Sequence, residues 1–498
     1  MTLTHHTTES ELPVDAPTQL FVAGRWAPAT TEKTIAVENP ATGQVLARVA
    51  DASPEDGARA LDAAAAAQQS WAATTPRVRA NLLRAAFDKV IERRDDFARL
   101  ITLEMGKPLA DAHAEVTYGA EFLRWFAEEA VRIHGRYANS PDGNSRLMVH
   151  EQPVGPCMFV TPWNFPLAMA TRKIGPALAA GCTVVIKPAA LTPLTTLLLA
   201  DVLHQVGVPD GVVNVVPTSS AGALVAPLLS DPRLRKISFT GSTPVGRALL
   251  RDSADQVLRA SMELGGNAPF LIFADADLDA ALAGAMIAKM RNTGQACTAA
   301  NRFLVHASIA DEFTGALTRA MAALRTGPGI EPATQVGPLV DGKSLAAVHG
   351  LVEDACAQGA RIRTGGTRLD GPGHFYPPTV LDQVPAHADI LREEIFGPVA
   401  PIVTFTTEEQ AVALANDTPY GLAAYAYTRD LARAQRLTEQ IESGMLGINT
   451  GLVSNPAAPF GGIKQSGLGR EGGSEGIKEY LESRYVAFAD PTTATPAR

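Results

Sequence analysis

Between residue 153 and about residue 262, short β-rich runs alternate with helical stretches, and this alternation limits the fold to a few types. The candidate strands are residues 154–160, 183–187, 212–216 and 236–239. Strands that alternate with helices form parallel sheets, because each helix returns the chain to the edge where the next strand begins. The pattern predicts an α/β fold with an open sheet of the nucleotide-binding type, which binds ligands at the carboxyl ends of its strands.

A second alternating section, from residue 270 to about residue 447, predicts a further α/β unit. Its candidate strands are residues 270–272, 303–305 and 401–405. Residues 53–136 read instead as helices, with Ser53-Pro54-Glu55-Asp56 as an N-terminal signature. Residues 137–150 carry turn residues and predict a hairpin outside the main body. Because 498 residues are too many for one hydrophobic core, we expect two or three domains.

The cysteine pattern and the charge bound the compartment and the partners. The four cysteines form no CxxC pair, so we expect a reducing cytosol and no disulfides. A net charge of −9 without a basic cluster argues against nucleic acid or a membrane surface as a partner. The start of the chain lacks the basic and apolar runs of a signal peptide. The longest apolar run, residues 175–186, is shorter than the ~18 residues that a membrane span needs, so we predict a soluble, cytoplasmic protein.

Cys297 is the residue best placed to react. It ends the stretch Arg291-Asn292-Thr293-Gly294-Gln295-Ala296-Cys297, a turn that directly follows an apolar helical run. Glu263 supplies a carboxylate beside two glycines, and Asn164 supplies an amide in another turn. A lone cysteine is more often an inert, buried residue, but a thiol with a carboxylate and an amide favours covalent carbonyl chemistry.

The cofactor candidates follow predicted strands. Gly241 and Ser242 begin a helix, where free backbone N–H groups bind phosphate and where Ser242 can cap the helix; a simple capping turn is the alternative. Lys187 ends the strand 183–187, so it is either a ligand contact or an ordinary surface lysine, and Glu394 has the same ambiguity. The histidines show no ligand spacing, so we assign no metal.

Six motifs follow one another along the chain. They are Pro162-Trp163-Asn164-Phe165-Pro166, Ile186-Lys187-Pro188-Ala189, Phe239-Thr240-Gly241-Ser242-Thr243, Glu263-Leu264-Gly265-Gly266, Gly294-Gln295-Ala296-Cys297 and Glu394-Ile395-Phe396-Gly397-Pro398. On these motifs the chain resembles the aldehyde dehydrogenase superfamily over nearly its whole length. The resemblance implies a Rossmann-type cofactor domain, an α/β catalytic domain and a small β oligomerisation extension. The implied division is 1–136 and 151–262 for dinucleotide binding, 263–447 for catalysis, and 137–150 with 470–498 for oligomerisation or bridging.

The resemblance also implies the roles of three catalytic candidates. Cys297 would attack an aldehyde carbon as a thiolate, giving a thiohemiacetal and then a thioester. The Asn164 amide and the Cys297 backbone N–H would hold the oxyanion, and Glu263 would be the general base for hydrolysis of the thioester.

The cofactor-binding residues implied by the resemblance are Trp163, Lys187, Ala190, Gly241, Ser242 and Glu394. Lys187 would contact the adenosine ribose, Ser242 the pyrophosphate and Glu394 the nicotinamide ribose. Many NAD-preferring relatives carry a glutamate where this chain has Ala190, and an acid there would repel a 2′-phosphate. We therefore expect NADP as the preferred cofactor and NAD as the possible alternative.

Finer resemblance indicates the substrate class. Arg172, Arg291 and Ser454, with the segment 460–472, look like those of succinate-semialdehyde dehydrogenases. Two arginines and a hydroxyl suit a distal carboxylate. The alternative is that both arginines are solvated or pair with carboxylates of the protein. Ala299 stands where that subfamily often has a second cysteine, so we expect no disulfide switch.

Other readings of the function stay open. The chain could oxidise another small aldehyde, such as glutarate semialdehyde or an aliphatic or aromatic aldehyde; it could be a cofactor-independent thiol hydrolase, or a non-catalytic oligomer. We expect a small-molecule aldehyde as the binding partner. We also expect a homodimer or homotetramer, because members of the family that the chain resembles assemble through an extension like residues 137–150, near a strand like residues 480–486. A sedimentation mass near 52.4 kDa would count against this assembly.

Overall fold

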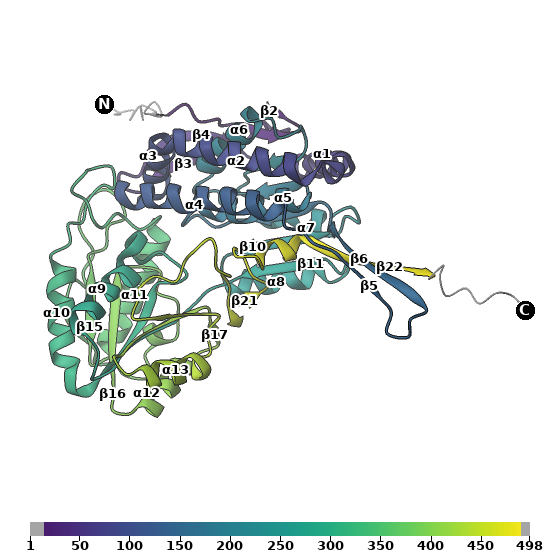
Figure 1. Cartoon of the computed structure of the whole chain (residues 1–498). Helices are drawn as coiled ribbons and strands as arrows, with labels where there is room; N and C mark the ends of the chain where they lie inside the picture. The colour runs from purple at the N-terminus through teal and green to yellow at the C-terminus, as the bar shows by residue number, and fades with distance from the viewer. Residues whose placement is uncertain (1–13, 490–498) are drawn as a thin grey trace, which may run out of the picture.

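The computed structural model describes residues 14–489, which form two open sheets, their covering helices and a projecting arm (Figure 1). The first sheet has the strand order β2-β1-β9-β8-β7-β10-β11-β21. Its central strands are β9 (Val213–Val215), β8 (Val184–Lys187), β7 (Cys157–Val160), β10 (Lys236–Thr240) and β11 (Arg259–Glu263), and all five are parallel. Its edges are β1 (Leu20–Val22) with β2 (Arg25–Ala27), and β21 (Gly467–Leu468), which pair antiparallel. The predicted parallel sheet is confirmed.

Helices cover both faces of this sheet because its strands are apolar on both faces. Along β7, Cys157 and Phe159 join one hydrophobic core, and Met158 and Val160 join the other. The first core packs against α2 to α6 and the second against α1, α7 and α8. These helices are α1 (Pro54–Ala73), α2 (Pro76–Glu92), α3 (Arg94–Met105), α4 (Leu109–Ala130), α5 (Pro166–Ala180), α6 (Leu194–Gln205), α7 (Ala221–Leu229) and α8 (Thr243–Ser253). Strands buried on both sides carry continuous apolar runs for this reason.

The helices predicted within residues 53–136 are confirmed as α1 to α4. The predicted start at Ser53 is a capping box: the Ser53 hydroxyl accepts from the Asp56 N–H, and the Asp56 carboxylate accepts from the Ser53 N–H. Such a cap is worth about 1 kcal/mol. A separate two-stranded sheet, β3 (Thr34–Asn39) with β4 (Gln44–Ala50), precedes these helices.

The second sheet has the order β14-β15-β16-β13-β12-β18-β19, in which only β14 is antiparallel. The strands are β12 (Ala268–Ile272), β13 (Ala300–His306), β14 (Arg361–Thr364), β15 (Thr379–Asp382), β16 (Val399–Phe405), β18 (Ala423–Tyr427) and β19 (Met445–Ile448). Phe270 and Ile272 face a core shared with α9 (Leu278–Met290) and α10 (Ala310–Ala322). Leu271 faces the core of α12 (Glu408–Asn416) and α13 (Leu431–Gln440), and α11 (Gly342–Ala357) covers a third cluster.

The predicted hairpin is confirmed as β5 (Arg136–Asn139) and β6 (Ser145–Pro153), so it extends a few residues beyond 137–150. The C-terminal strand β22 (Leu481–Ala489) pairs antiparallel with β6 along its whole length. Figure 1 shows this arm projecting from the body. In the described range 14–489, no helix is both long and apolar enough to cross a membrane. The division into domains stays a prediction.

Candidate active site

The carboxyl ends of the parallel strands bring several predicted residues to one edge of the first sheet. The turn after β7 carries Trp163 and Asn164, and β8 ends at Lys187. Ser242 follows β10, and β11 ends at Glu263. Because parallel strands share this edge, residues far apart in the sequence become neighbours there.

Cys297 meets these residues in a cavity of about 220 Å³. The predicted residues that line it are Trp163, Asn164, Gly241, Ser242, Glu263, Cys297 and Glu394. The predicted residues outside its lining are Arg172, Lys187, Ala190, Arg291 and Ser454. The structure therefore unites the three catalytic candidates and most of the cofactor candidates in one place.

A left-handed stretch of backbone precedes Cys297. Asn292, Thr293 and Gly294 have φ of 55°, 58° and 75°, a region that few L-residues adopt. A Cβ atom at Gly294 would also lie 2.2 Å from the carbonyl oxygen of Gly397. Across the cavity lining, a Cβ at Gly266 would lie 2.7 Å from the Cys297 carbonyl oxygen. The missing side chain at Gly294 lets the Cys297 loop approach Gly397, and the missing side chain at Gly266 lets the same loop approach the segment that follows Glu263.

Burial controls the protonation of the thiol and of the neighbouring carboxylate. Glu263 is 3% exposed, and neither of its carboxylate oxygens has a hydrogen-bond partner among the described residues. Burial raises the pKa of Glu263 to about 7, although the Arg172 guanidinium, 3.6 Å away, opposes the rise. Burial, and next the negative charge of Glu263, raise the pKa of Cys297 well above its ordinary value. The thiol is therefore protonated at neutral pH, and Glu263 is the adjacent group that can accept its proton.

The Asn164 side chain has hydrogen-bonding capacity to spare. Its Nδ2 donates only a long bond, 3.3 Å, to the Gln295 carbonyl, and its buried Oδ1 has no described partner. The Cys297 backbone N–H likewise has no acceptor within residues 14–489. Two available donors beside one thiol are the arrangement that stabilises an oxyanion.

The polar groups near the cavity fit a nicotinamide dinucleotide. Ser242 is the N-cap residue of α8, but its hydroxyl makes no capping bond, which counts against the alternative of a simple capping turn. That hydroxyl and the first N–H groups of α8 can bind a phosphate. Glu394 accepts one bond, from the Gly266 N–H at 3.3 Å, and burial raises its pKa to about 8.

Lys187 completes this set of cofactor candidates. It is 7% exposed, and burial lowers its pKa to about 8. None of the described residues forms an ion pair or a hydrogen bond with its ammonium. Because this ammonium lies at the carboxyl end of a parallel strand with no protein partner among the described residues, it is available to a polar ligand.

The predicted substrate residues separate into two environments. Arg291 and Ser454 line a second cavity of about 580 Å³, and Arg291 donates to the Ser454 hydroxyl at 3.4 Å. Arg172 is 1% exposed, lies outside both linings and forms an ion pair with Glu471. Arg172 thus has the protein carboxylate partner that the alternative interpretation expected, while its substrate role stays a prediction.

Glu471 is a neighbour of the site that the sequence patterns missed. It forms ion pairs with Arg172 and Lys173 of α5. Lys173 and Glu471 are 298 residues apart in the sequence. These two cations outweigh the effect of burial and lower the pKa of Glu471. No local pattern in the sequence pairs residues so far apart.

The family model described as "Aldehyde dehydrogenase family" matches residues 26–486. The chain belongs to the aldehyde dehydrogenase family. This aldehyde dehydrogenase is 62% identical over 447 residues to a succinate-semialdehyde dehydrogenase of Paenarthrobacter nicotinovorans. The aligned residues cover 90% of this chain and 99% of the relative. It is 49% identical to a glutarate-semialdehyde dehydrogenase of Pseudomonas aeruginosa, covering 94% and 97% of the two chains. The crystal structure of an E. coli NADP-dependent enzyme superposes with a TM-score of 0.94 at 48% identity, covering 95% and 98%.

Membership in the aldehyde dehydrogenase family confirms the resemblance and the fold predicted from the sequence. It identifies the protein as an oxidoreductase of the class that oxidises aldehydes with NAD or NADP. Within the part of the chain that the structure covers, no group of three or more His, Cys, Asp or Glu side chains could hold a metal ion.

Proposed function

We propose that this aldehyde dehydrogenase oxidises succinate semialdehyde to succinate with NADP. The observation that carries the proposal is the convergence in one cavity of the Cys297 thiol, the Asn164 amide and the Glu263 carboxylate, whose oxygens accept no hydrogen bond from the described residues. A second cavity, lined by Arg291 and Ser454, offers a guanidinium and a hydroxyl to a distal carboxylate. The name of the Paenarthrobacter nicotinovorans relative supports this substrate.

The first half of the proposed reaction forms a bond to Cys297. Glu263 accepts the thiol proton, and the thiolate adds to the aldehyde carbon, which transfers negative charge to the aldehyde oxygen. Asn164 Nδ2 and the Cys297 backbone N–H donate to that oxygen, and one such donor is worth roughly 3–4 kcal/mol in the transition state. When bound, the nicotinamide cofactor supplies the hydride acceptor. Loss of the hydride leaves a thioester on Cys297.

The second half hydrolyses this thioester. Glu263 first releases the proton that it took from the thiol, and then accepts a proton from a water molecule. The water oxygen attacks the thioester carbon, the C–S bond breaks, and the acid leaves while the proton that Glu263 took from the water returns to the sulfur. A base with a pKa of about 7 suits both proton transfers near neutral pH.

The proposed preference for NADP rests on Lys187 and Ala190. The Lys187 ammonium has no described partner, and Ala190 carries no charge that would repel a 2′-phosphate. The E. coli structural neighbour is named as an NADP-dependent enzyme, which supports the same cofactor.

The Arg291 guanidinium gives the first test of the substrate proposal. Replacing Arg291 with alanine is expected to raise KM for succinate semialdehyde about 10-fold to 100-fold, because a charge-assisted hydrogen bond is worth roughly 1.5–3 kcal/mol. KM for propanal, which has no distal carboxylate, should change less than about threefold. Steady-state kinetics of both aldehydes measure the difference. Equal changes for the two substrates would remove Arg291 from the carboxylate site.

The overall proposal is tested by production of reduced nicotinamide from succinate semialdehyde and from propanal, each with NADP and with NAD. We expect the acidic aldehyde with NADP to give the highest kcat/KM. Similar rates for both aldehydes would leave an aldehyde dehydrogenase with another substrate, and a clear preference for NAD would contradict the argument from Ala190.

Glutarate semialdehyde is the second candidate substrate. A relative with 49% identity carries that name, and the molecule differs from succinate semialdehyde by one methylene group. One methylene group changes the free energy of transition-state binding by only about 1–3 kcal/mol. Both semialdehydes can therefore fit the one cavity lined by Arg291. The ratio of the two kcat/KM values, measured in the same assay, decides between them.

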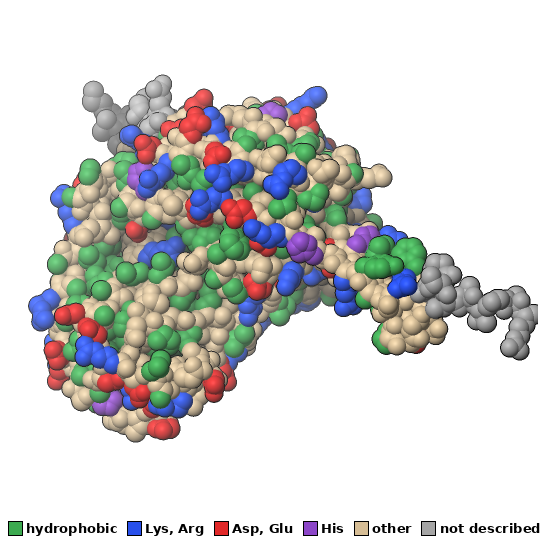
Figure 2. All heavy atoms as spheres, in the orientation of Figure 1, with side chains coloured by type: hydrophobic (Ala, Val, Ile, Leu, Met, Phe, Trp, Pro, Cys, Tyr) green, Lys and Arg blue, Asp and Glu red, His purple; other side chains and the backbone are tan. Residues whose placement is uncertain are grey.

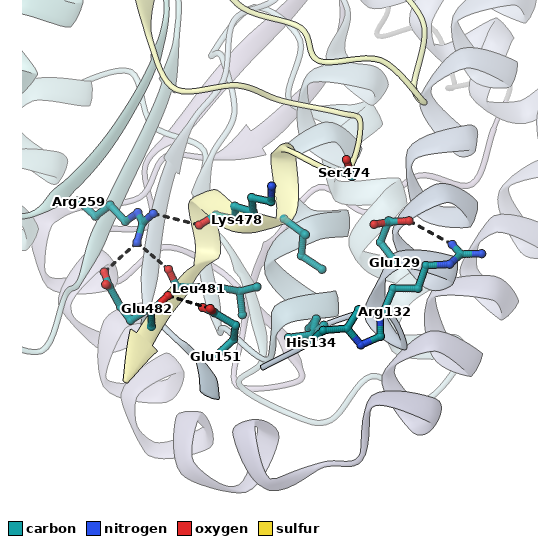
Figure 3. Close-up of a pocket in the computed structure, with 12 residues that line it drawn as sticks. Glu129, Arg132, His134, Glu151, Arg259, Ser474, Lys478, Leu481 and Glu482 are labelled. Atoms are coloured by element: carbon teal, nitrogen blue, oxygen red, sulfur yellow. Dashed lines mark hydrogen bonds and ion pairs between the residues drawn. The ribbon is translucent and has the colours of Figure 1, made fainter. Parts of the chain in front are cut away.

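We also infer a cytoplasmic homo-oligomer that assembles through the arm. Figure 2 shows hydrophobic side chains grouped on the arm, and also spread over the body, where acidic and basic side chains lie among them. Tyr137, Tyr485 and Phe488 are the exposed large apolar side chains of its strands. At the base of the arm lies a cavity of about 540 Å³. Acidic and basic side chains line it, and they include the ion pair of Arg259 with Glu482 (Figure 3). Exposed apolar surface beside interspersed charges is typical of a protein interface.

A further inference from the structure

We propose that Asn292 and Lys107 are positioning residues that hold the oxyanion-binding amide of Asn164. The inference rests on the proposed function, in which the Asn164 side chain donates to the oxyanion. The Asn164 main-chain carbonyl accepts two side-chain bonds, from Lys107 Nζ at 2.8 Å and from Asn292 Nδ2 at 3.0 Å. Both donors are fully buried. The turn that carries Asn164 is therefore fixed by two side chains that lie far from it in the sequence.

The Asn292 amide connects this turn to the loop of the nucleophile. Its Nδ2 also donates to the Gln295 carbonyl at 2.8 Å, and the Asn164 Nδ2 donates to that same carbonyl at 3.3 Å. The backbone N–H of Asn292 donates to Asp111 Oδ2 at 2.8 Å, which helps to hold its left-handed conformation. Asparagine is one of the few L-residues that adopt this conformation readily. One side chain thus links both proposed sources of oxyanion donors, the Asn164 turn and the Cys297 loop.

Lys107 is held in turn by Glu115 of α4. The two side chains are completely buried and form an ion pair. The other carboxylate oxygen of Glu115 accepts from the N–H groups of Leu167 and Ala168, in the first turn of α5, at 3.0 and 3.3 Å. The pair therefore fixes both the Asn164 carbonyl and the start of the helix that follows it. Breaking such a buried pair is costly, because the remaining charge has no partner.

Asn292→Gly is the variant that tests the positioning role. Glycine retains the left-handed backbone but removes both amide bonds. Oxyanion donors act only within a few tenths of an ångström of their ideal distance, and a misplacement of about 1 Å costs roughly 100-fold. We expect kcat to fall about 10-fold to 100-fold, while KM for the aldehyde and the dissociation constant of NADP change less than about threefold.

A double-mutant cycle separates positioning from a general loss of structure. Asn164→Ala alone is expected to lower kcat about 10²-fold to 10³-fold. If Asn292 acts through Asn164, adding Asn292→Gly should lower kcat little further, because the contact that it positions is already absent. A double variant whose loss equals the product of the two single losses would overturn the proposal.

Asn214 provides a matched control. It is a buried asparagine whose Nδ2 also bridges two main-chain carbonyls, those of Val184 and Gly211, but it belongs to β9. Asn214→Ala should lower Tm and leave kcat within about threefold of the unmodified enzyme. A fall in kcat equal to that of Asn292→Gly would mean that kcat reports only lost stability, and the proposal would fail.

Alkylation of Cys297 by iodoacetamide supplies a readout that needs no oxyanion. Asn292→Gly should leave the rate of alkylation within about threefold of the unmodified enzyme while kcat falls. An equal fall in both rates would show a disturbed thiol loop and refute the proposal.

If Asn292→Gly does not fold, Lys107→Met takes its place, with the same expected pattern. Normal kcat in Asn164→Ala would instead refute the oxyanion role in the proposed function. Impaired Asn164→Ala beside a fully active Asn292→Gly would refute only the present inference.

Discussion

Replacing Cys297 with serine is expected to lower kcat roughly 10⁴-fold to 10⁶-fold, the range seen when a covalent nucleophile is removed. A serine hydroxyl is a far weaker acid than a thiol, and the neighbouring base has a pKa of only about 7, so the hydroxyl stays protonated. NADP binding should be retained, because the polar groups proposed to bind it belong to other segments. Production of reduced nicotinamide measures the loss, and titration of the variant with NADP measures binding.

Cys356→Ser is the matched control for this substitution. Cys356 is also partly exposed, but it lies on α11 and lines none of the cavities described above. It should retain full activity. The thioester proposal also predicts an acyl group on the Cys297 peptide when the enzyme is quenched during turnover, and mass spectrometry detects that adduct. Cys297→Ser activity within tenfold of the unmodified enzyme would exclude Cys297 as the nucleophile.

The parallel strands of the first sheet that were predicted from the sequence are those whose burial shows in local composition. β7 and β8 are apolar on both faces, and both were predicted. β11 was missed, because its alternate residues Arg259, Ser261 and Glu263 are polar. The hydrogen-bond partners of the first two come from distant parts of the chain: Ser261 donates to Glu479 at 2.7 Å, and Arg259 donates to carbonyls near the C-terminus. Satisfied buried polar groups leave no apolar pattern in the sequence.

The catalytic residues of the site could be predicted from sequence motifs, but the ion pairs around them could not. Cys297, Glu263 and Asn164 each follow a recognisable turn or strand, and the structure brings them together. The sequence predicted a substrate-binding role for both Arg172 and Arg291, yet of the two only Arg291 lines either of the cavities of about 220 and 580 Å³. Because carboxylates distant in sequence approach Arg172 only in the fold, sequence spacing alone could not assign its partners.

The pairing of Arg172 also connects it to the general base. Its guanidinium lies 3.6 Å from Glu263 and opposes the rise in the pKa of that carboxyl. Burial alone would raise the pKa of Glu263 further. The carboxyl would then stay protonated at neutral pH and could not act as a base there. Arg172 therefore lowers the pKa of the general base toward the physiological pH range, against burial and the negative charge of Glu471, which both raise it.

Glu263→Gln is expected to lower the steady-state kcat about 10²-fold to 10⁴-fold while a first turnover persists. Glutamine cannot accept a proton from water, so the thioester accumulates. Glutamine also removes the proposed acceptor of the Cys297 proton, but it removes at the same time the negative charge that is one cause of the raised pKa of Cys297, so the first turnover should slow less than the steady state does. Rapid mixing should therefore show a burst of about one reduced nicotinamide per active site, followed by slow turnover.

The pH profile tests the same carboxylate independently. Because Glu263 acts when deprotonated and its pKa is about 7, kcat of the unmodified enzyme should rise as the pH increases through about 7. Glu263→Gln should lose this rise, whereas Glu92→Gln, which changes an exposed carboxylate at the end of α2, should retain both the rise and the rate. If the first turnover of Glu263→Gln slows as much as its steady state, Glu263 is needed before hydride transfer rather than for hydrolysis. An unchanged kcat would mean that another group activates the water.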